Sequence, residues 1–288
     1  MKKNFTLSEL FITCVVSLFS LICILPILLV FTNSIASEKS IGTYGYSFFP
    51  KEISLSAYRA IFYPGSPILK SYAISVFITA AGTILALLIT YLAAYALANR
   101  HVKYRNELAL FFFITTVFNS GLVPWYLMCK LLHLYNNIWS LIIPSLVFSP
   151  FNLFLMRNFI RGLPDSLMES AKMDGAKETR IAFQIYFPLC LPAIATVSLF
   201  YALGYWNDWF NAVMLLDNAN LYPLQMTLFK IQSDSKMLSE VTSIIAMNPP
   251  TESLKMATAI VTIGPIVLLY PFLQKYFVKG MIVGAIKG

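Results

Sequence analysis

The sequence predicts an all-α protein that crosses a lipid bilayer six times. Its 288 residues are 58% hydrophobic and only 12% charged, whereas soluble domains carry about 25% charged residues. Six stretches without Asp, Glu, Lys or Arg are longer than 18 residues, and no other such stretch exceeds 12 residues. Because a helix needs about 20 apolar residues to cross the hydrocarbon core, these six stretches have the length of transmembrane helices. The short alternating segments typical of spanning β-strands do not occur.

The uncharged stretches also give the positions of the spans. We expect transmembrane helices within residues 10–32, 71–98, 108–128, 138–156, 191–215 and 256–273. The first apolar run follows Lys2 and Lys3 as a signal peptide would, but it is longer than the roughly 7–15 apolar residues of such peptides. We therefore expect an uncleaved first span and a single transmembrane domain over residues 1–288, without a soluble domain.

The distribution of Lys and Arg predicts the orientation, because cytoplasmic segments are enriched in both. If the N-terminus is cytoplasmic, 13 of the 21 Lys and Arg residues fall in cytoplasmic segments, and both termini lie on that side. The net charge of +8 then reflects topology. The basic residues form no concentrated patch, so the sequence does not favour a nucleic-acid site.

Few residues suggest catalysis or metal binding. The four cysteines (Cys14, Cys23, Cys129 and Cys190) show no metal or redox spacing, and we interpret them as small core residues. The two histidines, His101 and His133, fall at opposite ends of spans. The segment from Gly65 to Ser71 lacks the glycine that precedes the lysine of a phosphate loop. A membrane-embedded enzyme is therefore poorly supported.

The cytoplasmic segment 163–188, between spans four and five, predicts a helix–turn–helix. Either Asp165 or Ser166 can cap its first helix, and Glu169 has the capping-box spacing from Ser166. Gly175 should end this helix, since glycine adopts the left-handed conformation most easily. A second helix should run from about Lys177, with Ile181, Ala182 and Ile185 on one side, before Pro188 and Pro192 bend the chain. This shape suits docking into a groove on a partner, although an ordinary solvated loop is the alternative.

Segment 163–188 resembles the coupling motif of ABC-importer permeases, in which E-A-A, G, I and L-P recur at fixed spacing. Here the motif reads Glu169-Ser170-Ala171, three residues, Gly175, nine residues, Ile185, Tyr186, Phe187-Pro188. Ser170 and Phe187 depart from it in type but not in position. Further segments resemble the carbohydrate-uptake (maltose-type permease) family and its oligosaccharide and polysaccharide-fragment subgroup: Asp174–Ala176, Lys279–Gly288, Ser120–Pro124, Tyr205–Asp208 and Leu221–Gln225.

The resemblance implies a permease subunit in a bacterial cytoplasmic (inner) membrane, with no enzyme activity of its own. It implies four kinds of partner: a second homologous permease subunit, two cytoplasmic ATP-binding subunits, an extracytoplasmic solute-binding protein and the bilayer. ATP and Mg would be held by the ATPase, and no cofactor by this chain. The extracytoplasmic loop 217–255 would meet the binding protein. The residues at the ATPase contact would be Glu169, Ser170, Ala171, Asp174, Gly175, Ile185 and Pro188.

Candidate residues for the sugar pathway lie in spans three and five. A carboxylate in or beside an apolar span is costly, so Asp208 suggests a function, and aromatic and amide neighbours suit a sugar. The candidates are Asn119, Ser120, Tyr205, Trp206, Asn207 and Asp208. Two alternatives remain, an interfacial anchor made by the tryptophan and hydrogen bonds between helices. At the level of function, the alternative is a self-contained ion-coupled secondary transporter, which should bury ionisable residues in several spans.

Overall fold

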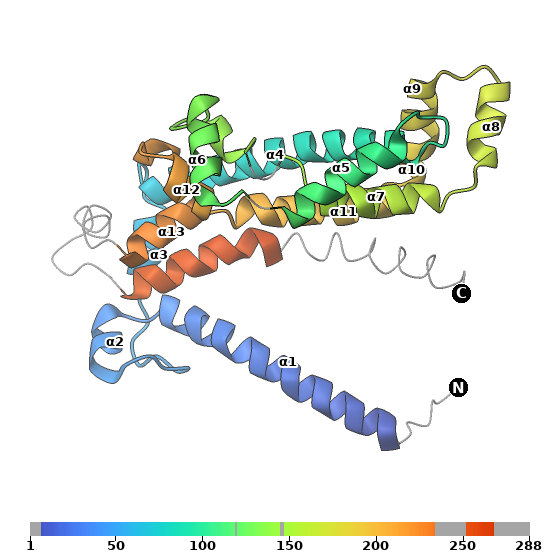
Figure 1. The fold of residues 1–288 in the computed structure, drawn as a ribbon. Helices are drawn as coiled ribbons and strands as arrows, with labels where there is room; N and C mark the ends of the chain where they lie inside the picture. Colours follow the sequence, from blue (N-terminus) through green and yellow to red (C-terminus); the bar gives the residue numbers. More distant parts are fainter. Residues whose placement is uncertain (1–6, 119, 145–146, 234–251, 268–288) are drawn as a thin grey trace. The chain divides into compact units, whose positions relative to one another are not determined.

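The computed structural model describes residues 7–118, 120–144, 147–233 and 252–267 (Figure 1). These residues form helices joined by turns, and the β-structure among them is one antiparallel bridge, between Ala36 and Ile53. The chain divides into two compact units, which we describe separately. The prediction of a helical protein is thus confirmed for the described residues.

Unit 1 combines residues 1–69 with residues 228–264. Its N-terminal part contains α1 (Leu7–Ser34), α2 (Glu38–Tyr44) and α3 (Ser56–Ile61). Polar side chains fix the end of α1. The Asn33 amide donates hydrogen bonds to the carbonyl oxygens of Leu29 and Ser47, at 2.7 and 3.1 Å, and its oxygen accepts from the Ser47 N–H. The chain that follows α1 is therefore folded back onto the helix end.

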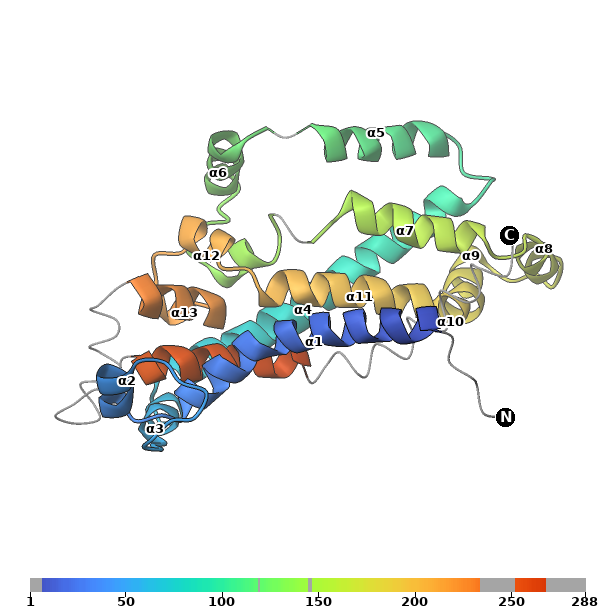
Figure 2. The same ribbon diagram turned by 90° about the horizontal axis from the view of Figure 1, so that it is seen from below.

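Unit 2 comprises residues 70–227 and 265–288. The helices α4, α13 and 252–267 contribute residues to both units. Within unit 2, α7 packs against α5 and α11 (Figure 2). The elements are α4 (Pro67–Ala98), α5 (Arg105–Val117), α6 (Leu122–Leu131), η1 (Ile138–Leu141), α7 (Pro150–Arg161), α8 (Ser166–Met173), α9 (Glu178–Arg180), η2 (Ile181–Tyr186), α10 (Phe187–Leu189), α11 (Leu191–Trp206), α12 (Phe210–Leu215), η3 (Ala219–Leu221) and α13 (Leu224–Ser233).

Buried hydroxyl groups join α4 and α11 in unit 2. Thr90 on α4 and Tyr201 on α11 share a hydrogen bond of 2.6 Å, and both are buried. The ring of Tyr205 fills the space over Gly82, which has no side chain to displace it. Tyr205 also donates to the carbonyl oxygen of Ile142 at 2.9 Å. Pairing these polar groups inside the unit avoids the cost of unsatisfied hydroxyls in an apolar environment.

Two helices are long and apolar enough to cross a membrane, Ser8–Ser34 and Pro67–Ala98. The number rises to four if two bent pairs each count as one span. The pairs are Arg105–Val117 with Leu122–Leu131, bent by 118°, and Glu178–Leu189 with Leu191–Trp206, bent by 82°. Both counts of candidate spans refer to the described residues, and they rest on the length and composition of the helices.

Three of the predicted spans differ from single helices. Residues 138–156 form the short η1 and then the start of α7, because Pro144 and Pro150 cannot donate the hydrogen bonds of a continuous helix. Residues 108–128 break between α5 and α6, and residues 191–215 break between α11 and α12. The last helix begins at residue 252, and residues 268–273 of the predicted span lie outside the described part of the chain.

Candidate functional site

The end of α8 is built by the backbone around Gly175. This residue has φ +76°, the left-handed conformation that the sequence led us to expect. Its N–H donates to the carbonyl oxygen of Lys172, and the N–H of Ala176 donates to that of Ala171, both at 3.0 Å. These two bonds form a Schellman motif, which satisfies carbonyl groups that the helix end would otherwise leave unpaired. The chain can then reverse within a few residues.

The second helical part of the segment contains a π-helical turn, Ile181–Tyr186. Its buried residues are Ile181, Ala182 and Tyr186, whereas Ile185 is half-buried. The expected apolar face is therefore shifted towards Tyr186. Pro188 lies just beyond the turn and lacks an N–H, so it cannot donate a hydrogen bond to the preceding turn. Beyond this turn the helix bends by 82° into α11.

Specific contacts attach the segment to α4 and to the residues that follow α4. Lys172 and Glu178 form an ion pair of 2.8 Å across the turn, and the Tyr95 hydroxyl on α4 donates to Glu178 at 3.0 Å. The Tyr91 hydroxyl, also on α4, donates to the carbonyl oxygen of Ala182. Aromatic contacts accompany these bonds, including one between Tyr91 and Phe187 with ring centroids 5.3 Å apart. The segment is thus held against α4 by polar and apolar contacts together.

A further contact lies at the start of α8. Asp165 forms an ion pair of 2.8 Å with Arg100, which follows α4, and both side chains are largely exposed. Asp165 occupies the N-cap position, but its side chain makes no capping hydrogen bond to α8. Of the two caps that the sequence allowed, Asp165 therefore binds Arg100 instead of the helix. An exposed pair of this kind adds about 0–1 kcal/mol to stability. Its main effect is therefore to position the start of α8 beside the residues that follow α4.

The predicted coupling residues fall into two groups. Glu169, Ser170, Asp174, Gly175 and Pro188 are exposed and available to a partner, whereas Ala171 is buried and Ile185 half-buried. The sequence reasoning missed Met173, which has 88% of its surface exposed at the end of α8. An apolar residue directly before Asp174 and Gly175 was the available signal. Exposed methionine is an adaptable contact surface for another protein.

The pathway candidates of span five gather at the end of α11. Tyr205 and Trp206 are buried, and the Trp206 ring meets Tyr72 edge-on at 5.9 Å. Asn207 is exposed and accepts a hydrogen bond from Gln225 at 3.2 Å. Here Tyr205 and Trp206 serve helix packing, and Asn207 presents a polar group at the surface.

The Asp208 carboxylate is bound to the first turn of α12. It accepts from the backbone N–H and the side-chain amide of Asn211, at 3.1 and 2.7 Å. The break between α11 and α12 is therefore stabilised by this residue. Of the candidates in span three, Ser120 is exposed in the break between α5 and α6, and Asn119 lies outside the described residues.

The start of the loop 217–255 is held by residues that the sequence reasoning did not single out. Asn136, in a left-handed conformation with φ 52°, accepts hydrogen bonds from the N–H groups of Asp217 and Asn218. Tyr135 donates to the Asp217 carboxylate at 2.7 Å. Asparagine adopts this conformation more readily than most residues. The signal available was the pair of asparagines at positions 136 and 137.

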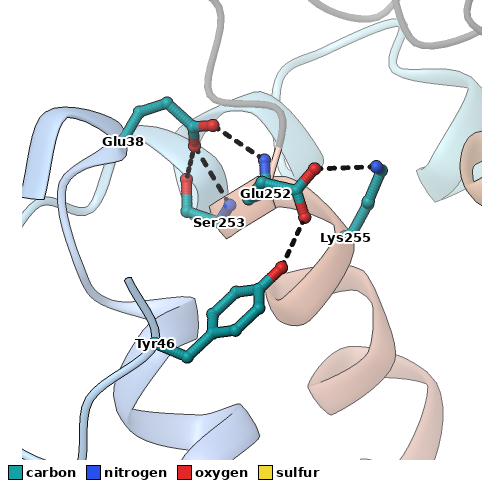
Figure 3. A network of polar contacts seen from close by, with 5 residues as sticks. All are labelled: Glu38, Tyr46, Glu252, Ser253 and Lys255. Carbon is teal, nitrogen blue, oxygen red and sulfur yellow. Dashed lines mark hydrogen bonds and ion pairs between the residues drawn. The ribbon is translucent and has the colours of Figure 1, made fainter. Parts of the chain in front are cut away.

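The other end of the loop belongs to unit 1 and is shown in Figure 3. The Glu38 carboxylate accepts from the N–H groups of Glu252 and Ser253, at 2.9 and 3.1 Å, where the last described helix begins. Glu252 in turn accepts from Tyr46 and Lys255. Hydrogen bonding to Lys255 and then to Tyr46 lowers the pKa of Glu252. Residues 234–251 of the loop lie outside the described part of the chain.

The groups at these sites are suited to non-covalent binding. Over the described residues, no three His, Cys, Asp or Glu side chains come close enough to hold a metal ion. The groups that do converge are hydroxyl, amide, carboxylate and aromatic side chains at helix ends. Such groups can bind a partner protein or a sugar without a covalent step.

Comparisons with known proteins agree with this description. The chain is 40% identical to Protein LplC of Bacillus subtilis, over 93% of this chain and 90% of that protein. It is 39% identical to the polygalacturonan/rhamnogalacturonan transport system permease protein YtcP of the same organism, over 94% of this chain and 95% of that protein. A solved structure, a bacterial ABC transporter involved in the import of the acidic polysaccharide alginate, matches with TM-score 0.87 and 31% identity, over 96% of this chain and 100% of that one.

The family model described as "Binding-protein-dependent transport system inner membrane component" matches residues 92–283, more than half of the chain. That range contains the whole of segment 163–188. The predicted resemblance to importer permeases is confirmed, and the chain belongs to the family of binding-protein-dependent transport system inner membrane components.

Proposed function

We propose that this permease forms half of the translocation pathway for an oligosaccharide and transmits ATP-driven movement through segment 163–188. The observation that carries the proposal is the exposed end of α8, with Glu169, Asp174 and Gly175 at motif spacing in a chain of this family. Helix α8 ends in the exposed apolar residue Met173, and segment 163–188 is attached to α4 at several points. A push on α8 would therefore pass to α4 through the contacts of Glu178 and Ala182.

The proposed architecture has six spans in one domain over residues 1–288, with both termini in the cytoplasm. The two long helices and the two bent pairs supply four spans. The remaining two would be residues 138–156, as a broken span, and residues 256–273. Segment 163–188 then lies in the cytoplasm and the loop 217–255 outside. The chain would sit in the bacterial cytoplasmic membrane.

The proposed partners follow the division of labour in ATP-driven importers. A second homologous permease would complete the pathway, and two separate ATP-binding subunits would hold ATP and Mg and contact α8. A solute-binding protein would deliver the sugar to the loop 217–255. This chain would bind no cofactor and catalyse no reaction. The family match favours this assembly over an ion-coupled transporter that acts alone.

The proposed cargo is an oligosaccharide, and fragments of acidic polysaccharides are the first to test. The named cargo of one relative is polygalacturonan or rhamnogalacturonan, and the solved transporter is involved in alginate import. In this chain, Ser120, Asn207 and Asp208 offer polar groups in or beside the breaks of two helices. We propose these residues, with Asn119, as candidates for the sugar path. Tyr205 and Trp206, which are buried between helices, would shape that path by their packing.

Purification of the tagged chain with its subunits in mild detergent tests the coupling segment. In the Gly175→Pro variant, proline cannot adopt the left-handed conformation and cannot donate the Gly175 N–H bond. We expect a second permease and an ATPase to co-purify with the wild-type chain, and the ATPase to be lost from this variant.

Gly45→Pro is the matched control. Gly45 ends α2 with φ 74°, and its N–H also bonds a carbonyl group of the preceding helix, that of Ile41. This variant should keep the ATPase, because α2 lies far from segment 163–188 in the proposed topology. If both variants retain the ATPase, segment 163–188 is not the contact.

A further inference from the structure

A cleft of about 540 Å³ lies in unit 2 beside the coupling segment. Its walls come from the end of α4 and the residues after it, from the end of α7, and from α8 and η2. Two buried residues, Tyr95 and Tyr186, also line it. Met173 and Gly175, at the end of α8, do not line the cleft, whereas Glu169, a predicted coupling residue, does.

The lining carries more positive than negative groups. Arg100, His101, Arg105 and Arg161 face the cleft, together with the carboxylates of Asp165 and Glu169. Arg100 and Asp165 neutralise each other in their ion pair of 2.8 Å. Among the remaining Arg, Asp and Glu side chains of the lining, Arg105 and Arg161 then face Glu169 alone.

Arg105 and Arg161 have no ion-pair partner among the described residues. A third guanidinium lies close by. Burial, followed by the positive charges of Arg161 and Arg105, lowers the pKa of Arg157. The Arg157 Nε donates to the carbonyl oxygen of Leu97 at 3.2 Å, so it is fixed in place. Arg157 does not itself line the cleft, but an anion bound near Arg105 and Arg161 would reduce the repulsion among the three guanidinium groups.

We propose that this cleft binds a phosphate group, with the guanidinium groups of Arg105 and Arg161 as its principal ligands. Arginine presents a rigid fork of N–H donors that matches phosphate oxygens in pairs. The cavity is large enough for a phosphate with its substituent, since ligand pockets begin at about 300 Å³. The aromatic side chains of Tyr95 and Tyr186, which line the cleft, can contact the non-phosphate part of the molecule.

Two sources can supply this phosphate, the headgroup of an anionic phospholipid and a soluble phosphate. Basic pockets between helices at the cytoplasmic surface of a membrane bind anionic headgroups. The position at that surface rests on the proposed topology, whereas the anion site itself rests on the cleft and its arginines. The experiment therefore measures the two sources separately, and it measures ATPase co-purification on the same samples.

In the first arm, the full chain with its co-purifying subunits is placed in nanodiscs of phosphatidylcholine with phosphatidylglycerol, and retained lipid is counted by native mass spectrometry. In the second arm, inorganic phosphate is titrated by calorimetry into the same protein in phosphatidylcholine nanodiscs. The test variant is Arg105→Gln with Arg161→Gln. The control is Lys103→Gln with Arg180→Gln, which removes the same charge outside the lining.

We expect wild type and control to bind alike, and the test variant to bind about tenfold more weakly or not at all. Loss in the first arm identifies a lipid headgroup, and loss in the second arm identifies a soluble phosphate. If the double variant does not fold, the same binding measurements are made on the single variant Arg161→Gln, which changes an exposed side chain. The proposal is overturned if the wild type binds neither probe, or if the folded test variant binds as the control does. If the ATPase does not co-purify with the wild-type chain, that result counts against the proposed coupling and not against the anion site.

Discussion

At Gly82, helix α4 leaves room for the ring of Tyr205 on α11. A Cβ atom at this position would lie 2.5 Å from the Tyr205 Cζ atom. The ring cannot simply move aside, because its hydroxyl is bound to the Ile142 carbonyl oxygen and the side chain is buried. The close approach of the two helices thus depends on the absence of a single side chain.

We predict that Gly82→Ala lowers the melting temperature of the protein in detergent. Overpacking costs about 1–3 kcal/mol, which exceeds the gain of up to about 1 kcal/mol in helix propensity. Gly42→Ala is the control, since no atom lies within 4 Å of its added Cβ, and it should be neutral or slightly stabilising. Equal melting temperatures for the two variants would show that α4 and α11 adjust freely.

Tyr91 is the residue through which α4 holds the π-helical turn. It is almost fully buried, and its hydroxyl donates to the carbonyl oxygen of Ala182. That oxygen also accepts the N–H of Phe187. Removal of the hydroxyl therefore weakens the contact without leaving the carbonyl group unpaired.

We predict that Tyr91→Phe lowers the free energy of unfolding by about 1 kcal/mol, the usual contribution of one hydrogen bond. It should also lower the ATPase activity that the binding protein stimulates, while the ATPase still co-purifies. Tyr63→Phe, at a side chain that is 46% exposed, is the control. Stimulated activity equal to that of the control would argue against transmission through this contact.

Among the elements, the last described helix has an unusual N-terminus. Its first N–H groups are satisfied by Glu38, a residue of α2, and a carboxylate there is favoured by the helix dipole. Glu252, in the first turn, accepts from both Lys255 and Tyr46. The start of this helix is thus fixed by the segment that follows α1.

This network predicts a loss of stability in acid. Lys255, and then Tyr46, lower the pKa of Glu252 in the folded protein below its ordinary value of 4.5. The stabilisation is therefore complete above that value and is lost as pH falls through the lowered pKa. We expect melting temperatures recorded from about pH 6 to pH 3 to fall less steeply in Glu252→Gln than in the wild type. Identical slopes would mean that Glu252 is not linked to unfolding.

The elements also show where sequence reasoning works. The left-handed turn at Gly175 could be predicted because only glycine adopts that conformation without strain. The prolines at positions 188 and 192 likewise indicated the bend. The attachment of Asp165 to Arg100 could not be predicted, since it depends on a residue far away in the sequence.

The candidate pathway shows the same limit. Aromatic and carboxylate residues at positions 205–208 suggested a sugar site from their chemical type alone. Their partners, Ile142 for Tyr205 and Asn211 for Asp208, became visible only with the fold. Residue type indicates what a side chain can bind, and packing decides what it does bind.

At the scale of the whole molecule, the proposed six spans predict the side of each loop. We expect alkaline phosphatase fused after residues 60, 134 or 230 to be active, because these positions are predicted to lie outside. Fusions after residues 103 or 170 should be inactive with phosphatase and fluorescent with green fluorescent protein. Activity at residue 170 would place segment 163–188 on the wrong side for an ATPase and would contradict the proposed topology.

The bonds between Glu38 and Glu252 join residues that are 214 positions apart in the chain. During synthesis, α1 and α2 therefore leave the ribosome long before the helix that Glu38 must cap. Until then the N–H groups of Glu252 and Ser253 are not yet there for its carboxylate to accept from. Unit 1 combines residues 1–69 with residues 228–264, so it can close only after residues 70–227 of unit 2 have been made. Chains truncated before residue 252 should therefore retain an N-terminal part that cannot form the bonds of Glu38 to Glu252 and Ser253.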